Sequence, residues 1–142
     1  MSKGKLEKFA EIGTFPNVFQ LPYLHSSDDF SLKGIWRKEY FKNENPLVLE
    51  LGCGKGEYTV GLAEKFPYIK FEGIDISEGQ LYFAYKKAKK FKNYHPKKGD
   101  YHDLNEFPKQ SFNIVFEIEA VCYSLEKEKV LKEVSLKSNS LC

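Results

Sequence analysis

Residues 45–75, NPLVLELGCGKGEYTVGLAEKFPYIKFEGID, decide the fold of this chain. The apolar run LVLEL predicts a buried strand, and it leads into a turn with glycine at three of five positions, Gly52, Gly54 and Gly56. Residues 69–76 predict a second strand with an acid, Asp75, near its end. A glycine-rich turn between a strand and a helix is typical of a site where the backbone passes close to a ligand.

The segments on either side continue an alternation of strands and helices. Residues 56–66 predict a helix that ends before Pro67, with Tyr58, Leu62 and Phe66 on one face. Residues 77–91 predict a helix with Ser77 as N-cap, and residues 124–137 an amphipathic helix that begins at Ser124. A weak third strand is expected in residues 93–100 and a strong fourth in residues 111–121. This order favours an α/β fold with a right-handed parallel sheet.

Residues 1–44 are predicted to be a lead-in without a periodic pattern, followed by a single domain over residues 45–142. Within the lead-in, residues 25–31 are typical of a loop or helix cap, and residues 33–41 favour a short helix. The strand expected in residues 111–121 begins with a continuous apolar run, although no further apolar run follows to supply a neighbour. We therefore expect self-association, or a partner that covers this edge of the sheet.

Composition limits the functional classes. The chain has 142 residues, 42% hydrophobic and 30% charged, with a net charge of +2, which excludes a disordered chain and a strongly basic nucleic-acid binder. Neither a signal peptide nor a membrane-spanning segment is visible. Three unpatterned cysteines, Cys53, Cys122 and Cys142, favour a reducing, cytoplasmic location. The three histidines are scattered, so no metal site is expected.

The glycine turn departs from the dinucleotide fingerprint in two ways. Its third glycine comes one position early, and Glu50 lies two residues before the first. A carboxylate so close disfavours a pyrophosphate and suits a ligand with a cationic amino-acid tail. Asp75 is placed to accept both hydroxyls of a ribose. An unphosphorylated nucleoside with a cationic tail is S-adenosylmethionine, and its candidate contacts are Glu50, Gly52, Cys53, Gly54 and Asp75.

Simpler interpretations stay open for these residues. The glycines are also compatible with a purely structural turn, and Asp75 with a helix cap. Cys53 is interpreted as a small residue tolerated between glycines, since no base is visible to make it a nucleophile.

Three further features bear on the ligand. Asp103, in a turn after the third strand, is a candidate to accept a hydrogen bond from the adenine amine, with Asp100 as its competitor. Glu119, which with Glu117 is expected on one face at the end of the fourth strand, is a candidate substrate contact or a solvated strand end. Residues 85–98 hold seven lysines and no acid, interpreted as a solvated helix end far from the methyl donor rather than an RNA surface. No catalytic residue is assigned.

Two segments resemble known methyltransferases. LELGCGKGEYTVGLA (residues 49–63) and GIDI (residues 73–76) resemble motif I through the second strand of class I S-adenosylmethionine-dependent methyltransferases, which implies a Rossmann-like fold. Residues 3–76 resemble bacterial tRNA (guanine-N7)-methyltransferases, which implies that Glu50 and Asp75 contact the cofactor. Residues 99–134 instead resemble sterol- and ubiquinone-type enzymes, which usually continue into LKPGG and another strand. The chain is therefore expected to join two methyltransferase halves near residue 77 and to be truncated after the fourth strand and its helix.

The resemblance implies three functional alternatives. The first is a tRNA (guanine-N7)-methyltransferase with tRNA as partner, where the ring nitrogen already has a lone pair and positioning replaces a strong base. The second is a small-molecule methyltransferase acting on a sterol or quinone precursor, in which Glu119 stabilises developing positive charge. The third is an inactive cofactor-binding fragment. The sequence leaves the methyl acceptor and the oligomeric state open.

Overall fold

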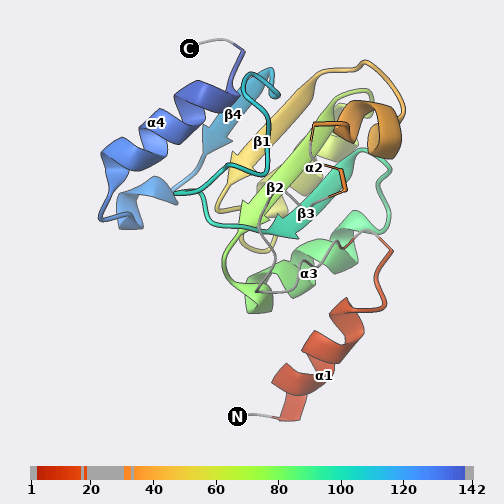
Figure 1. The fold of residues 1–142 in the computed structure, drawn as a ribbon. Coiled ribbons are helices and arrows are strands. Elements are labelled where there is room, and N and C mark those ends of the chain that lie inside the picture. Colours follow the sequence, from red (N-terminus) through yellow and green to blue (C-terminus); the bar gives the residue numbers. More distant parts are fainter. Residues whose placement is uncertain (1–2, 17, 19–30, 33, 140–142) are drawn as a thin grey trace.

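A parallel four-stranded sheet forms the centre of the computed structural model, which describes residues 3–16, 18, 31–32 and 34–139 (Figure 1). The strand order is β3-β2-β1-β4, and all three strand pairs are parallel. The strands are β1 (Leu47–Leu51), β2 (Lys70–Asp75), β3 (Tyr94–Lys98) and β4 (Ile114–Glu117). The predicted α/β class and all four predicted strands are confirmed. The loop expected in residues 25–31 falls almost wholly outside the described residues.

One face of the sheet is covered by α2 (Glu57–Lys65) and α3 (Glu78–Ala88). Val48 of β1 and Phe71 of β2 are buried there because alternate side chains of a strand point to the same face. The predicted face of α2 is wrong at Tyr58, which is 59% exposed. The helix instead buries Thr59 and Ala63, one turn apart.

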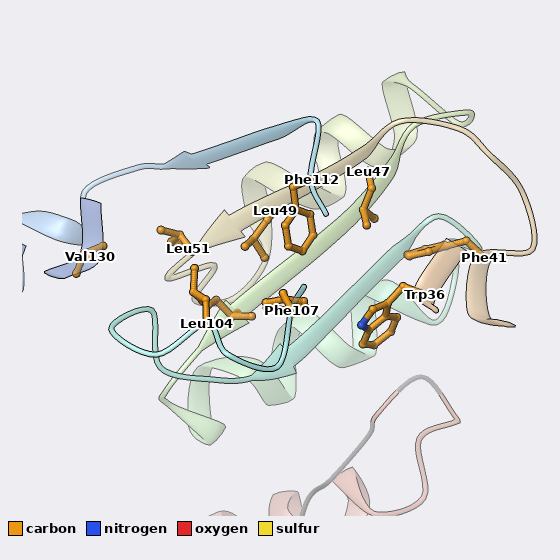
Figure 2. Packing of buried hydrophobic residues seen from close by; sticks show 10 residues of the cluster. Trp36, Phe41, Leu47, Leu49, Leu51, Leu104, Phe107, Phe112 and Val130 are labelled. Atoms are coloured by element: carbon orange, nitrogen blue, oxygen red, sulfur yellow. The ribbon is translucent and has the colours of Figure 1, made fainter. Parts of the chain in front are cut away.

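The opposite face carries the largest hydrophobic cluster (Figure 2). Leu47, Leu49 and Leu51 of β1 point into it and meet Phe107 and Phe112 from the segment between β3 and β4. Helix α4 (Lys127–Lys137) contributes Val130, and η2, a π-helix over Trp36–Phe41, contributes its first and last residues. Helix α4 begins three residues after the predicted start at Ser124.

Helix α1 (Lys3–Ile12) was not predicted, because three lysines in ten residues obscure its apolar pattern. It packs against α3. Ile12 of α1, Phe15 of the turn that follows and Tyr82 of α3 are buried in one cluster. The Tyr82 hydroxyl also donates a 2.7 Å hydrogen bond to Glu11 Oε2. These tertiary contacts, rather than helix propensity, stabilise α1.

Strand β4 is shorter than predicted and lies at one edge of the described sheet. Ile114 is 53% exposed, which differs from the two-sided burial expected of its apolar run. Just before β4, Phe112 forms a parallel bridge with Ser138, beyond α4. The Phe112 amide donates to the Lys137 carbonyl at 3.0 Å, and its carbonyl accepts from Asn139 at 2.8 Å. Coverage of this edge by a second chain stays a prediction.

A buried polar layer lies between the sheet and η2. His95 Nδ1 and Glu72 Oε2 are 2.8 Å apart with both side chains fully buried, and the Trp36 ring is 4.8 Å from the His95 ring. Beside them Lys97 forms an ion pair with Glu106. The interpretation of the lysine run as a solvated helix end is therefore wrong at Lys97, which is 2% exposed. Among the described residues, no helix is long and apolar enough to span a membrane.

Candidate functional site

The glycine turn lies between the carboxyl end of β1 and the start of α2. Gly52 has a φ of +67°, and a Cβ added there would lie 2.4 Å from the Ala120 Cβ, so a side chain has no room. Gly54 also has a positive φ, +53°, but no atom lies within 4 Å of a Cβ added there. The turn therefore combines one glycine required by packing with one whose backbone borders open space.

Asp75, the last residue of β2, is hydrogen-bonded to this turn. Its Oδ2 accepts from the Gly54 amide at 2.9 Å, and its Oδ1 accepts from the Ser77 amide at 2.7 Å. Each carboxylate oxygen has lone pairs for further donors. The structure thus brings Asp75 and the turn together, and leaves Asp75 able to accept hydroxyl donors from a ligand beside Gly54.

Glu50 is a buried carboxyl group at the end of β1. It is 3% exposed, and its Oε2 has no hydrogen-bond partner among the described residues. Burial, and secondly the negative charge of Asp75, raises its pKa to about 7. A buried carboxylate without a partner is costly, and a cation bound nearby would lower that cost. A ligand with a positive charge would suit this carboxyl group, and contact of Glu50 with such a ligand, expected from its position before the glycines, stays a prediction.

Cys53 lies within the turn but is not arranged as a nucleophile. Its thiol is buried, and burial together with the charges of Glu50 and Asp75 raises its pKa well above the ordinary value. Its amide donates to the Ile74 carbonyl at 2.9 Å, and an added Cβ on Gly73 would lie 3.0 Å from the Cys53 Sγ. Cys53 is thus a small packing residue that fixes the turn against β2.

The two acids after β3 lie in one exposed loop. Asp103 Oδ1 accepts from the Asn105 amide at 3.1 Å, which leaves the other oxygen for a ligand. Asp100 Oδ1 is bound to His102 by both the backbone amide and the ring. Contact of either acid with a ligand stays a prediction, and the contacts of Asp100 leave Asp103 as the freer acceptor.

Tyr101, between these acids, was missed by sequence reasoning. Its hydroxyl donates to the Ala120 carbonyl at 3.3 Å, and its ring is 4.0 Å from a Cβ added on Gly52. The loop after β3 therefore lies against the glycine turn through this ring. A single aromatic residue in a polar turn gives no sequence pattern from which this contact could be inferred.

The expected pairing of Glu117 and Glu119 on one strand face is wrong, because β4 ends at Glu117. Glu117 Oε2 accepts from the amides of Ala120 at 2.9 Å and Val121 at 3.0 Å, so it holds the loop after β4. The Glu119 side chain is exposed, and its backbone has a left-handed conformation with a φ of +57°. The structure places it in that loop without bringing it to Glu50 or Asp75 through any described hydrogen bond or ion pair.

The lysine run also differs from expectation at its far end. Lys98 is paired in register with Asp75 across β2 and β3, and its Nζ lies 2.9 Å from Glu78 Oε1. This lysine is therefore at the same edge of the sheet as the glycine turn, whereas the run was expected to lie at the opposite edge. In the last two turns of α3, Lys86 and Lys87 pair with Glu11 and Glu57 respectively.

Solved structures share this fold. The YcgJ protein from Bacillus subtilis is 26% identical, with a TM-score of 0.58 over 66% of this chain and 40% of that chain. Phosphoethanolamine N-methyltransferase 2 from Haemonchus contortus, solved in complex with S-adenosyl-L-methionine, is 23% identical, with a TM-score of 0.60 over 66% of this chain and 22% of that chain. The predicted Rossmann-like methyltransferase fold is thereby confirmed.

Curated relatives match at higher identity over a shorter length. The tRNA (guanine-N(7)-)-methyltransferase of Bacteroides fragilis is 52% identical over 83 residues, 58% of this chain and 33% of that protein. The protein of the same name from Christiangramia forsetii is 50% identical over 88 residues, 61% and 39% respectively. The chain thus spans about a third of the length of these relatives. Residues 42–140 match the family model described as "Methyltransferase domain", and the chain belongs to this methyltransferase family.

Proposed function

We propose that this chain binds S-adenosylmethionine at the glycine turn and uses it as a methyl donor. The observation that carries the proposal is the buried carboxyl of Glu50, whose Oε2 has no described hydrogen-bond partner, close to Asp75 at a turn where Gly54 borders open space. These groups suit a ligand that combines a positive charge with hydroxyl donors. When bound, the cofactor supplies a methyl group made electrophilic by its sulfonium.

Each residue of the site has a separate role in this proposal. Glu50 accepts hydrogen bonds from the cationic amino-acid end, and Asp75 accepts the two ribose hydroxyls while its bond to Gly54 keeps the turn in place. Asp103 accepts from the adenine amine, and Glu119 faces the methyl acceptor. Gly52 and Cys53 contribute backbone and packing rather than charge. The protein's contribution to the reaction is then chiefly positioning of donor and acceptor.

For the acceptor we propose guanine N7 of a tRNA. The support is the tRNA (guanine-N(7)-)-methyltransferase relatives, whose 83 to 88 matching residues are about half identical to this chain. The N7 nitrogen carries a lone pair and no proton, so this reaction needs no general base. A reaction without a general base agrees with a site in which the acids Glu50 and Asp75 are proposed to bind the cofactor.

An assay with two acceptors tests both parts of the proposal. The purified chain is incubated with methyl-labelled S-adenosylmethionine and either unmodified tRNA or a lipid extract, and the products are analysed by mass spectrometry. We expect N7-methylguanosine in tRNA, and its loss in Asp75→Ala but not in the surface control Glu64→Gln. Label in a lipid product instead would replace the tRNA proposal with the small-molecule alternative. Cofactor binding without transfer to either acceptor would favour the inactive fragment.

A further inference from the structure

Three side chains from two loops form a continuous hydrogen-bonded chain. His102 Nδ1 lies 2.6 Å from Asp100 Oδ1, and His102 Nε2 lies 2.7 Å from Ser124 Oγ. Asp100 and His102 belong to the loop after β3. Ser124 follows η3 (Val121–Tyr123), just before α4. The serine is 22 residues from the histidine, so the arrangement depends on the fold rather than on local sequence.

The partners determine which atoms carry the protons. An ionised carboxylate can only accept, so His102 Nδ1 carries the hydrogen and donates it to Asp100. Although partial burial acts to raise the pKa of Asp100, the backbone and ring hydrogen bonds from His102 hold it below its usual value. In this tautomer His102 Nε2 is an acceptor, to which the Ser124 hydroxyl donates. This is the protonation pattern that activates a serine by an oriented imidazole base.

The surroundings of Ser124 provide space and hydrogen-bond donors. Ser124 is 6% exposed and lies on the wall of an open hollow of about 620 Å³ lined by residues 124–129. The hollow lies at the amino end of α4. The amide of Val130 donates to the Glu126 carbonyl and is the first amide of α4 with a described backbone acceptor. The preceding amides of α4 are donors of the kind that stabilise a developing oxyanion. Ser124 Oγ accepts from the Glu126 amide at 3.0 Å, which leaves one lone pair for attack.

We propose that Ser124, with His102 as base and Asp100 as positioning residue, is a nucleophile for short-chain esters. Ser124 Oγ forms a bond to the ester carbonyl carbon while its proton passes to His102 Nε2. The ester C–O bond breaks, and the alcohol leaves with that proton. Water then attacks the acyl carbon, gives one proton to His102, and releases a carboxylic acid as the proton returns to Ser124. Short acyl groups are favoured because Leu125 is the one apolar residue among those that line the hollow.

A fluorophosphonate probe tests the nucleophile directly. The full chain is treated with the probe without S-adenosylmethionine, and the modified residue is located by peptide mass spectrometry. We expect labelling of Ser124, and no labelling of Ser135, an exposed serine on α4 that serves as internal control. Ser124→Ala is expected to abolish labelling, and Ser135→Ala to leave it unchanged. Because no cofactor is present, failure of the proposed methyl transfer would not affect this result.

His102→Gln separates catalysis from structural support. Glutamine retains hydrogen-bonding groups but is no base, so we expect labelling and p-nitrophenyl acetate hydrolysis to fall about a hundredfold or more, with the thermal unfolding midpoint close to that of the original chain. Equal labelling rates in this variant and the original chain would overturn the proposal. So would the absence of label on Ser124 in the original chain, which would reduce the three residues to a structural link between loops. If His102→Gln does not fold, labelling of Ser124 over Ser135 in the original chain decides.

Discussion

The carboxylate of Asp75 and the amide of Gly54, 21 residues apart in sequence, are joined by a 2.9 Å hydrogen bond. This bond connects the end of β2 to the glycine turn after β1. The same carboxylate accepts from Ser77 and so also holds the start of α3. Asp75 therefore organises the backbone of the site in addition to its proposed contact with a ligand.

Two glycines of the turn give a matched pair of substitutions. Gly52→Ala brings a Cβ to within 2.4 Å of Ala120 and strains a left-handed backbone, whereas Gly54→Ala adds only the backbone strain. We expect Gly52→Ala to lower the free energy of unfolding by about 3 kcal/mol or more and Gly54→Ala by about 1 kcal/mol. Urea denaturation of both variants measures the difference. Equal losses would show that Ala120 does not restrict the turn.

The buried carboxyl of Glu50 predicts a dependence of stability on pH. Its pKa in the folded protein is about 7, against a reference value of 4.5. Between these values the folded protein binds more protons than the unfolded chain, so the free energy of unfolding falls as pH rises. The contribution of Glu50 is complete below about pH 4.5 and lost above about pH 7, a change on the order of 3 kcal/mol.

Glu50→Gln isolates this contribution from that of other acids, such as the fully buried Glu72, whose pKa burial also raises. We expect the variant to be more stable than the original chain at pH 8 and to show a shallower decline between pH 5 and pH 7. Chemical denaturation at a series of pH values checks both statements. Parallel profiles for the two proteins would contradict the raised pKa of Glu50.

Neighbouring lysines on β3 are expected to differ in their effect on stability. Lys97→Ala leaves the Glu106 carboxylate with its cation removed inside the core, and we expect a loss of about 3–5 kcal/mol. Lys98→Ala removes an exposed partner of Glu78, and we expect a change within about 1 kcal/mol. Thermal and urea unfolding compare the two. Lys97→Met combined with Glu106→Leu is expected to recover most of the loss, and no recovery would mean that packing rather than charge accounts for it.

The central part of the fold was predictable because the residues that define each element lie within or next to it in the sequence. The fully buried run of β1, the glycines that follow it and Pro67 after α2 each act within a few residues of the element they define. Helix α1 was not predictable in this way, since its stability depends on contacts with α3 about 70 residues away. The length of β4 was overestimated because an apolar run does not show where its strand partner ends.

The candidate site was predictable where a residue's position next to the glycine turn indicates its role. Glu50 and Asp75 were found from their positions relative to the glycines, Glu50 two residues before Gly52 and Asp75 near the end of the next strand. The structure joins Asp75 to the glycine turn by a hydrogen bond. Lys97 was misassigned because a run of lysines does not show that Glu106, nine residues later, folds back to it. The link from His102 to Ser124 was missed for the same reason, since two separate loops form it.

Calorimetric titration with S-adenosylmethionine is the most direct test of the cofactor site, with the original chain compared with Asp75→Ala and the surface control Glu64→Gln. We expect the original chain and the control to bind with equal affinity, and Asp75→Ala to bind more weakly by more than about 1 kcal/mol, the size of a lost charge-assisted hydrogen bond. No binding by the original chain, or equal binding by Asp75→Ala, would contradict the account.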